Sequence, residues 1–245
     1  MTRKLDIESD ISRRASGLDA VALRKTYLDQ DEFLVVDEFL SGEIMGQWRE
    51  QLEVLKPHIH RNFIPKHKKG GSVSFSTLSA NAPAMRSVYQ SPALLAFLKQ
   101  ITGAEMQECP GSDPHRCALY AYTEEGDHIG WHYDTSYYKD RRWTLLVGFQ
   151  DNSSSRLECK LHTRNPGHDQ VSLSLRVSPG TLVLFNGDKV YHAVTPTKAG
   201  EERYMVSMQY VTNAAMNPFM RFVSNMKDSI AYFGLKEVFI GHKRS

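Results

Sequence analysis

Two histidines and one aspartate are the residues of this sequence best suited to chemistry: His132, Asp134 and His192. The first two stand in the run Gly-Trp-His-Tyr-Asp. Side chains alternate between the two faces of a β-strand, so His132 and Asp134 are expected on one face, close enough to bind a single ion. Two imidazoles and one carboxylate on adjoining strands can hold Fe(II) and leave coordination positions open. The sequence therefore predicts a metal centre of this type.

A histidine and an acidic residue two positions apart are weak evidence in isolation. With 10 histidines and 28 acidic residues among 245, about one such pair is expected by chance. The sequence that follows supplies context, because it contains short strand-like runs broken by turn residues. These runs are residues 142–150, 156–161, 178–186, 191–196 and 200–211. Their regular spacing is typical of a β-sandwich or barrel rather than of alternating strands and helices.

This region resembles the iron(II)/2-oxoglutarate-dependent oxygenase superfamily, and in particular its prolyl-hydroxylase-like branch. The resemblance runs from about residue 119 to residue 211. Its motifs are a tyrosine before His-x-Asp, an Arg-x-Thr strand, a Pro-Gly-x-Leu-x-x-Phe strand, a second histidine and a later arginine. The chain supplies them in order as Tyr122, His132, Asp134, Arg142, Thr144, Pro179, Gly180, Leu182, Phe185, His192 and Arg203. One departure is Ser153 to Ser155, which replace a Gly-Gly pair common in this branch.

The resemblance implies a mainly β fold with a double-stranded β-helix core, the jelly-roll or cupin-like architecture, supported by helices at both ends. We expect one domain over residues 1–245. Its parts would be a helical N-terminal support over 1–110, the jelly-roll core over 111–213 and a C-terminal helical segment over 214–245. Residues 61–75 are charged and contain Gly70 and Gly71, so they are predicted to form a loop, which is a candidate lid.

The N-terminal part also shows a strand and two helices. Residues 31–37 are typical of a strand, and Ser41 is placed to cap a helix. The apolar face of that helix would carry Ile44, Met45, Trp48, Leu52 and Leu55. A second helix is expected from Ser91 to Gly103, because proline favours helix starts and glycine favours helix ends. Its buried candidates are Leu94, Leu95, Phe97 and Leu98.

The resemblance also implies the cofactors, which are Fe(II) on His132, Asp134 and His192, with 2-oxoglutarate and dioxygen in the open positions. By strand period Arg203 points into the barrel, where an unpaired cation is costly, so it needs an anionic partner. A structural carboxylate is one candidate; the resemblance favours the far carboxylate of 2-oxoglutarate, which a guanidinium can meet bidentately. Tyr122 and Thr144 are hydroxyl candidates beside it.

Within the superfamily, residues 126–138 look like those of small bacterial enzymes that hydroxylate or halogenate free amino acids. Halogenating members carry Gly or Ala in place of the metal carboxylate, so Asp134 favours hydroxylation. The predicted function is therefore hydroxylation of an unactivated C–H bond of a small substrate, a free amino acid such as a basic one. The alternatives are a peptidyl, prolyl-type hydroxylase and a non-redox, cupin-like binding module, although a cupin has no need of the buried Arg203.

The residues that would contact the substrate are less sharply indicated. Ser207 and Gln209 face inward by strand period, either as a polar edge for the substrate or as partners in structural hydrogen bonds. Asn213 lies just beyond them. Glu124 and Asp127 are candidates to receive a substrate ammonium, although a solvated acidic loop explains them as well. Cations available for a carboxylate are Arg61, Lys66, Lys69 and Arg86.

Composition limits the other function classes. The chain has 41% hydrophobic and 24% charged residues and a net charge of +2, which is too small to indicate nucleic acid or an anionic membrane as partner. No apolar leader and no membrane-spanning stretch is visible, so we expect a cytoplasmic protein. Its three cysteines, an odd number at unrelated spacings, indicate reduced thiols. The expected partner is a small-molecule substrate, and the oligomeric state is not indicated.

Overall fold

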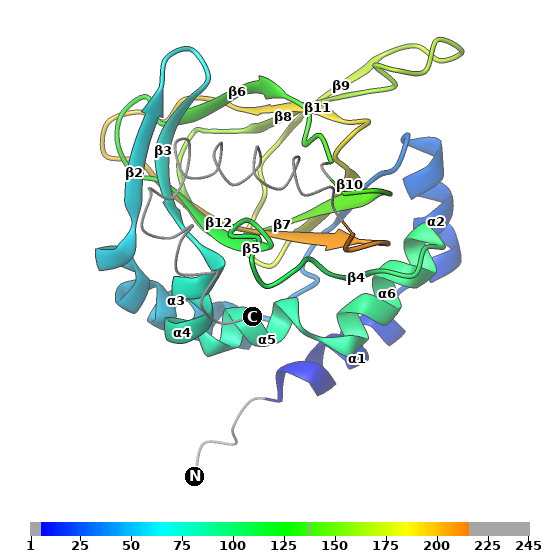
Figure 1. The fold of residues 1–245 in the computed structure, drawn as a ribbon, viewed down its shortest axis with the longest axis horizontal. Helices are drawn as coiled ribbons and strands as arrows, with labels where there is room; N and C mark the ends of the chain where they lie inside the picture. The colour runs from blue at the N-terminus through cyan, green and yellow to red at the C-terminus, as the bar shows by residue number, and fades with distance from the viewer. Residues whose placement is uncertain (1–5, 137, 216–245) are drawn as a thin grey trace.

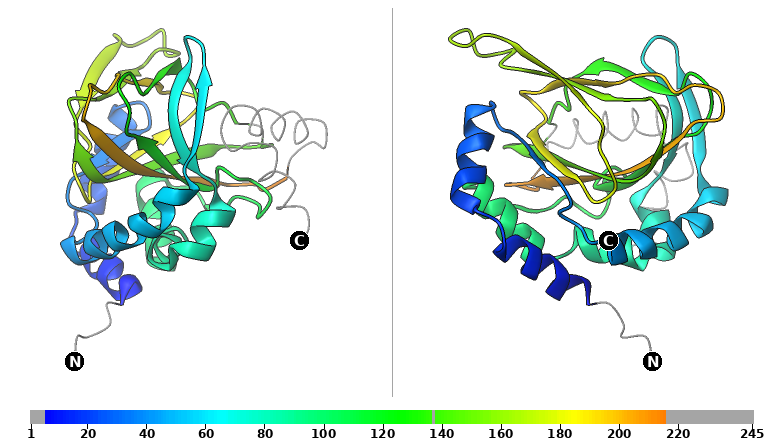
Figure 2. Two further views of the ribbon diagram at one scale, coloured as in Figure 1. Left: turned by 90° about the vertical axis from the view of Figure 1, so that its left-hand side faces the viewer. Right: turned by 180° about the vertical axis from the view of Figure 1, so that it is seen from behind.

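The computed structural model describes residues 6–136 and 138–215. These residues form one strongly curled antiparallel sheet, with helices gathered below one half of it (Figures 1 and 2). The predicted mainly β, jelly-roll type fold is confirmed. The strands are β1 (Phe33–Val36), β2 (His60–Ile64), β3 (Lys68–Val73), β4 (Gln107–Glu108), β5 (Cys117–Tyr122), β6 (His128–His132), β7 (Arg142–Asn152), β8 (Leu157–Leu161), β9 (Val171–Leu175), β10 (Leu182–Asn186), β11 (Tyr191–Val194) and β12 (Glu202–Val211).

The order of strands in the sheet explains how distant segments meet. It runs β1-β10-β7-β12-β5-β3-β6-β11-β8-β9, with β2 added beside β3 and β4 beside β12. The curl turns β6, β11 and β8 over the half made by β12, β7 and β10 (Figure 1). One face of the sheet therefore lines an interior, and the other face meets either helices or the surface.

Among the described residues the helices lie in the N-terminal part, where helical support was expected. They are α1 (Ile7–Ser16), α2 (Ala20–Asp29), α3 (Gly42–Leu55), the short 3-10 helix η1 (Lys56–His58), α4 (Phe75–Asn81), α5 (Pro83–Tyr89) and α6 (Pro92–Thr102). The Ser41 hydroxyl accepts from the Ile44 N–H, which caps α3 as predicted, and all five apolar residues expected on that helix are buried. Gly103 ends α6 at φ +73°, a conformation that suits glycine.

Two apolar clusters form on the two faces of the long strands β7 and β12. The face toward the helices carries Trp143, Leu145, Val147, Phe149, Tyr204, Val206, Met208 and Tyr210. The opposite face belongs to the interior, where the main apolar cluster contains Phe33, Tyr122, Ile129, Leu157, Cys159, Leu161, Val177, Val183, Phe185, Val190, Val194 and Met205. We call this second set the interior cluster. The two-residue period of the strands thus separates the packing face from the face available for chemistry.

The loop predicted for residues 61–75 is wrong. This segment is a β-hairpin, in which β2 pairs with β3 and β3 pairs in turn with β5 and β6. The glycines serve close strand packing instead of a loop: a Cβ on Gly71 would lie 2.4 Å from the Ile59 side chain, and one on Gly70 would contact the Tyr122 ring. The N-terminal region 1–110 therefore contributes strands as well as helices. Of the predicted segment 214–245, all but residues 214 and 215 lie outside the described residues.

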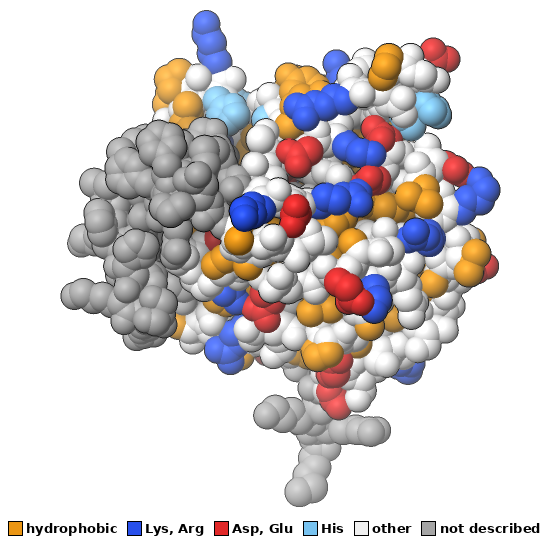
Figure 3. All heavy atoms as spheres, turned by 45° about the vertical axis from the view of Figure 1, so that its right-hand side comes forward, with side chains coloured by type: hydrophobic (Ala, Val, Ile, Leu, Met, Phe, Trp, Pro, Cys, Tyr) orange, Lys and Arg blue, Asp and Glu red, His pale blue; other side chains and the backbone are white. Residues whose placement is uncertain are grey.

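The surface shows a mixed distribution of charge on the face seen in Figure 3. Basic and acidic side chains are interspersed there over both the helices and the sheet. Among the described residues, no helix is long and apolar enough to cross a membrane.

Candidate metal centre

His132, Asp134 and His192 come together inside the curled sheet. His132 is the last residue of β6 and lies opposite His192 of β11 in the register of the two strands. One donor atom from each of the three residues lies within 4.8 Å of the other two. Nε2 of His132 is 3.4 Å from Oδ1 of Asp134, and Nε2 of His192 is 3.9 Å from Oδ2. The three donors therefore converge on one point, as a single metal ion requires.

Backbone carbonyls orient both imidazoles. Nδ1 of His132 lies 2.8 Å from the Gly130 carbonyl oxygen, and Nδ1 of His192 lies 3.1 Å from that of Val190. A carbonyl oxygen only accepts, so each Nδ1 must carry the proton. Each Nε2 then has a free lone pair directed at the other donors, which is the tautomer needed to bind a metal.

The surroundings of this centre favour the metal-binding forms of His192 and Asp134, whereas those of His132 favour its protonated form. Burial lowers the pKa of His192 to about 4, with His132 adding to the effect against the opposing charge of Asp134. Burial alone would raise the pKa of Asp134, but the two histidines and Arg142 hold it well below its usual value. The pKa of His132 is raised, because its contacts with Asp134 and Gly130 outweigh burial and the positive charge of Lys68.

Thr144 contacts the metal-binding carboxylate, a role that was not predicted for it. Its hydroxyl oxygen is 2.6 Å from Oδ2 of Asp134 and 3.1 Å from Oε1 of Gln209. The one hydroxyl proton goes to the charged and closer acceptor, so Thr144 donates to Asp134. The strand register of β7 and β12 sets this arrangement by placing Gln209 opposite Thr144. The structure thus gives Thr144 a contact with Asp134 where a contact with 2-oxoglutarate was expected.

Gly187 also shapes the position of Asp134. A Cβ at this position would lie 2.6 Å from the Asp134 Cβ and 2.7 Å from its backbone oxygen. Sequence reasoning missed this residue, because the chain around it carries no motif.

Arg203 is completely buried, as predicted, and points into the interior from β12. Its Nη1 donates to the Ser155 hydroxyl at 3.1 Å and its Nη2 to the Met205 sulfur at 2.9 Å, while Nε has no hydrogen-bond partner among the described residues. Its guanidinium carbon lies 5.9 Å from the centre of the Tyr122 ring. Burial lowers the pKa of Arg203, yet an arginine stays protonated in a protein.

The surroundings of Arg203 fit an anionic ligand. Within the described part of the chain, its guanidinium forms no ion pair with a carboxylate at 4.0 Å or less, although Asp151 acts on it at longer range. A buried cation without a close counter-ion is costly, and a ligand carboxylate would remove that cost. Ser155, which already holds one arm of the guanidinium, was not predicted; it belongs to the serine run that departs from the family motif.

Ser207 and Gln209 face the interior, as predicted, and are buried. Gln209 Nε2 donates to the Ser207 hydroxyl at 3.3 Å. Gln209 Oε1 lies 3.1 Å from the Thr144 hydroxyl oxygen, so these polar side chains are neighbours beside Asp134. Asn213 lies apart from them, because its amide donates to Asp140 at 3.0 Å near the surface. Each of these three polar side chains therefore has a hydrogen-bond partner within the protein, which was the structural alternative to a contact with the substrate.

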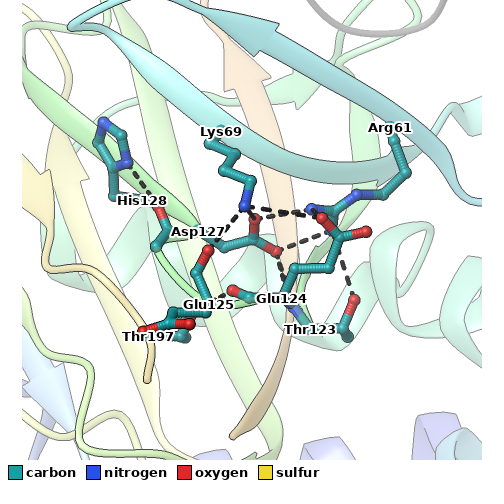
Figure 4. A network of polar contacts seen from close by, with 9 residues as sticks. Arg61, Lys69, Thr123, Glu124, Glu125, Asp127, His128 and Thr197 are labelled. Carbon is teal, nitrogen blue, oxygen red and sulfur yellow. Dashed lines mark hydrogen bonds and ion pairs between the residues drawn. The ribbon is translucent and has the colours of Figure 1, made fainter. Parts of the chain in front are cut away.

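Asp127 and Glu124 are joined to the β2–β3 hairpin (Figure 4). The guanidinium of Arg61 donates to both carboxylate oxygens of Asp127, at 2.8 and 2.7 Å, and the N–H groups of Thr123 and Glu124 donate to one of them. Glu124 is 56% exposed and forms an outer ion pair with Arg61 at 2.9 Å. Asp127 is fully buried with internal partners, so the expected contact of these acids with a substrate ammonium has no support in the structure.

Comparison with known proteins agrees with this centre. Residues 18–139 match the family model described as Halogenase D, and residues 117–210 match that of the 2OG-Fe(II) oxygenase superfamily. The second match contains all three metal-binding candidates and Arg203. A search of curated proteins found no match.

Solved structures show the same fold at low sequence identity. The non-heme alpha ketoglutarate dependent carbocyclase SnoK from nogalamycin biosynthesis is 13% identical, with a TM-score of 0.66 over 93% of this chain and 92% of the other. A prolyl hydroxylase from Trichoplax adhaerens, in complex with a peptide fragment, is 14% identical, with a TM-score of 0.64 over 91% and 98%. The epimerase SnoN with Fe3+ and alpha ketoglutarate is 15% identical, with a TM-score of 0.63 over 82% and 88%.

The superfamily match, the converging donors and the buried arginine point to the same chemistry. The chain carries a 2OG-Fe(II) oxygenase domain over residues 117–210 and is a 2-oxoglutarate-dependent dioxygenase that uses Fe(II) and dioxygen.

Proposed function

We propose that this dioxygenase hydroxylates an unactivated C–H bond of a small free amino acid. The observation that carries the proposal is the presence of Asp134 as the third donor in a chain whose residues 18–139 match Halogenase D. A carboxylate at this position occupies the place that halogenating enzymes leave for chloride. Hydroxylation is then the reaction that the donor set supports.

The proposed roles of the residues follow from their places in the interior. His132, Asp134 and His192 would hold Fe(II) through two Nε2 atoms and one carboxylate oxygen. Arg203 would bind the far carboxylate of 2-oxoglutarate, with the Tyr122 side chain beside it. Iron bound here with 2-oxoglutarate and dioxygen supplies the oxidising power to break a C–H bond, with succinate and CO2 as coproducts.

The interior cluster has a separate role in the proposal. Its apolar side chains are buried, Phe185 and Val190 completely, and the Phe185 and His192 ring centres are 4.9 Å apart. Such a lining keeps bulk water away from the metal centre, which limits side reactions.

The test measures succinate formed from 2-oxoglutarate under air with Fe(II), in the presence of single free amino acids or of a peptide library. We expect one amino acid to stimulate succinate formation and to gain one oxygen atom by mass spectrometry. His192→Ala should abolish both signals, because it removes one of three metal donors. Hydroxylation of a peptide when every free amino acid is inert would overturn the proposed substrate class.

The Arg203→Leu variant tests binding of 2-oxoglutarate independently of binding of the metal. Loss of a charged contact in an apolar interior is worth on the order of 2–5 kcal/mol, or roughly 30-fold to several thousandfold in affinity. We expect the variant to bind 2-oxoglutarate more weakly by this factor. An anaerobic titration with 2-oxoglutarate, followed by the absorption band of the Fe(II)–2-oxoglutarate complex, measures the affinity, and the iron content should be unchanged. A titration curve like that of the wild type would show that Arg203 serves another partner.

A further inference from the structure

Three aromatic side chains pack together on the outer side of the strands that carry the metal-binding histidines. Trp131 and Tyr133 stand on either side of His132, and Tyr191 precedes His192. The ring centre of Tyr191 lies 5.2 Å from that of Trp131 and 4.8 Å from that of Tyr133. Neighbouring side chains of a strand point to opposite faces, so these rings lie outside the sheet while the imidazoles point inward. We call the three residues the outer aromatic group; its members come from the neighbouring strands β6 and β11 and from the residue after β6 (Figure 1).

Tyr133 has further contacts that fix its side chain. Its hydroxyl donates to the Thr163 hydroxyl oxygen at 2.9 Å, and the Thr163 hydroxyl donates to the Lys189 carbonyl oxygen at 3.2 Å. The guanidinium carbon of Arg164 lies 3.9 Å from the centre of the Tyr133 ring, a distance at which a cation and a ring attract each other. Tyr133 is therefore held by the segment after β8 and, through Thr163, by the segment before β11.

The place of Tyr133 in the chain makes these contacts relevant to the metal centre. Peptide bonds join Tyr133 directly to two of the three donors, His132 and Asp134. In the register given by the described residues, β6 and β11 form two residue pairs, of which one is His132 with His192, and the pairing is irregular between them. β6 ends at His132, so strand pairing holds His132 but does not extend to Asp134.

We propose that Tyr133 is a positioning residue for the metal centre, which fixes His132 and Asp134 relative to each other from the outer side of the sheet. This inference rests on the proposed role of the three donors and is independent of the substrate class. Both donors must reach the same ion, so a displacement of the residue between them separates them from that ion. Contacts behind metal ligands typically change metal affinity by roughly 10- to 100-fold.

Trp131 provides a matched comparison within the outer aromatic group. It also stacks on Tyr191 and is also a neighbour of His132. Trp131 lies within β6, however, and on the far side of His132 from Asp134. If the stack contributes only packing, the loss of either ring should have the same effect; if Tyr133 positions Asp134, the two variants should differ in metal binding.

The experiment compares Tyr133→Leu with Trp131→Leu. Fe(II) affinity is measured by anaerobic titration, the absorption band of the Fe(II)–2-oxoglutarate complex is recorded at saturating iron, and urea unfolding of the metal-free proteins measures stability. We expect Tyr133→Leu to bind Fe(II) at least about 10-fold more weakly than the wild type and to shift the band. Trp131→Leu should keep the wild-type affinity and band, although both variants lose stability because both lose a ring contact with Tyr191.

A second pair of variants keeps the ring in place. Tyr133→Phe and Thr163→Val remove the two ends of one hydrogen bond. Each should weaken Fe(II) binding by roughly threefold, the effect of one ordinary hydrogen bond. The double variant should bind Fe(II) no more weakly than Thr163→Val alone, because the bond can be lost once.

Wild-type Fe(II) affinity and an unshifted band in Tyr133→Leu would overturn the role of Tyr133, and so would an equal loss of affinity in Trp131→Leu. If Tyr133→Leu did not fold, the second pair would decide: no loss of affinity, or losses that add in the double variant, would overturn the role. His192→Ala separates this proposal from the metal centre itself. Wild-type Fe(II) affinity in His192→Ala would overturn both, whereas weak binding in His192→Ala with none of the expected loss in Tyr133→Leu would remove only the role of Tyr133.

Discussion

At the scale of single residues, the metal centre depends on side chains that do not bind the metal. Asp134 follows the end of β6, so its own strand does not hold it. Its carboxylate is positioned by the Thr144 hydroxyl, and its backbone lies against Gly187. Such supporting contacts orient the donors and tune metal affinity.

The first prediction concerns Gly187. In Gly187→Ala the new Cβ would meet both the Cβ and the backbone oxygen of Asp134 at 2.6 and 2.7 Å, so the aspartate must move. We expect Fe(II) affinity to fall by about 10-fold, by analogy with other changes next to metal ligands. Anaerobic metal titration measures this. Gly46→Ala in α3 is the matched control, because a Cβ there meets nothing within 4 Å; equal affinities for the two variants would contradict the prediction.

The second prediction concerns Thr144. Thr144→Val keeps the shape of the side chain and removes the hydroxyl that donates to Asp134. Fe(II) affinity should fall by about 10-fold, whereas 2-oxoglutarate affinity at saturating iron should stay unchanged. Thr144→Ser should restore most of the metal affinity, because it restores the hydroxyl. A loss confined to the 2-oxoglutarate titration would instead support the role expected from the sequence.

At the scale of elements, one ion pair fastens the β2–β3 hairpin to the turn between β5 and β6. Arg61 lies in β2 and Asp127 just before β6, and the pair is bidentate. The pKa of Asp127 lies below its usual value, because Arg61 and two backbone N–H groups outweigh burial. Since β6 carries His132, this contact connects the hairpin with a strand that lines the interior.

The third prediction follows from that contact. Asp127→Asn should lower the free energy of unfolding at neutral pH by about 2 kcal/mol, a value reduced for the partial exposure of Arg61. A carboxyl whose folded-state pKa is lowered stabilises the protein above its unfolded pKa, which is near 3.8. The stabilisation is lost as the pH falls through the folded-state value.

Urea unfolding at neutral pH and in acid measures this difference. The difference in free energy of unfolding between the wild type and Asp127→Asn should be smaller in acid than at neutral pH. Glu124→Gln is the control, because Glu124 also pairs with Arg61 but is 56% exposed; it should change stability little. If this difference in free energy of unfolding stayed constant across the pH range, the charge of Asp127 would not be what stabilises the folded state.

At the scale of the whole molecule, the curl of the sheet makes one site from distant segments. His132 and His192 are 60 positions apart in the chain and directly opposite each other in β6 and β11. A metal ion bound there joins these strands to the loop that carries Asp134. Ligands that bind only the folded state stabilise it.

The fourth prediction is therefore a thermal shift. Anaerobic Fe(II) at about 100 times its dissociation constant should stabilise the protein by about 2.7 kcal/mol, which raises Tm by roughly 5 to 10 °C for a chain of this size. Differential scanning calorimetry measures the shift, and a chelator should reverse it. Fe(II) should raise the Tm of His192→Ala only slightly. A rise in Tm as large as that of the wild type would show that the metal binds at another site.

Much of this protein could be predicted from local sequence. The alternation in β12 sends Arg203, Ser207 and Gln209 inward whatever the neighbouring strand is, and the types of His132, Asp134 and His192 limit the metal. The cap at Ser41 and the end of α6 at Gly103 are likewise local. These features depend on the type of each residue or on residues close in sequence, so residue type and strand period determine them.

Other features depended on which strands become neighbours, and only the tertiary structure decided them. In the sequence, Gly70 and Gly71 indicate a loop. In the fold they lie in a strand, where the absence of side chains lets that strand pack closely against Tyr122 and Ile59. Asp127 is an acidic loop residue in sequence and a buried partner of Arg61 in the fold. Thr144 meets Asp134 because strand register fixes this contact. Register is set by contacts between residues far apart in the chain, which local patterns do not contain.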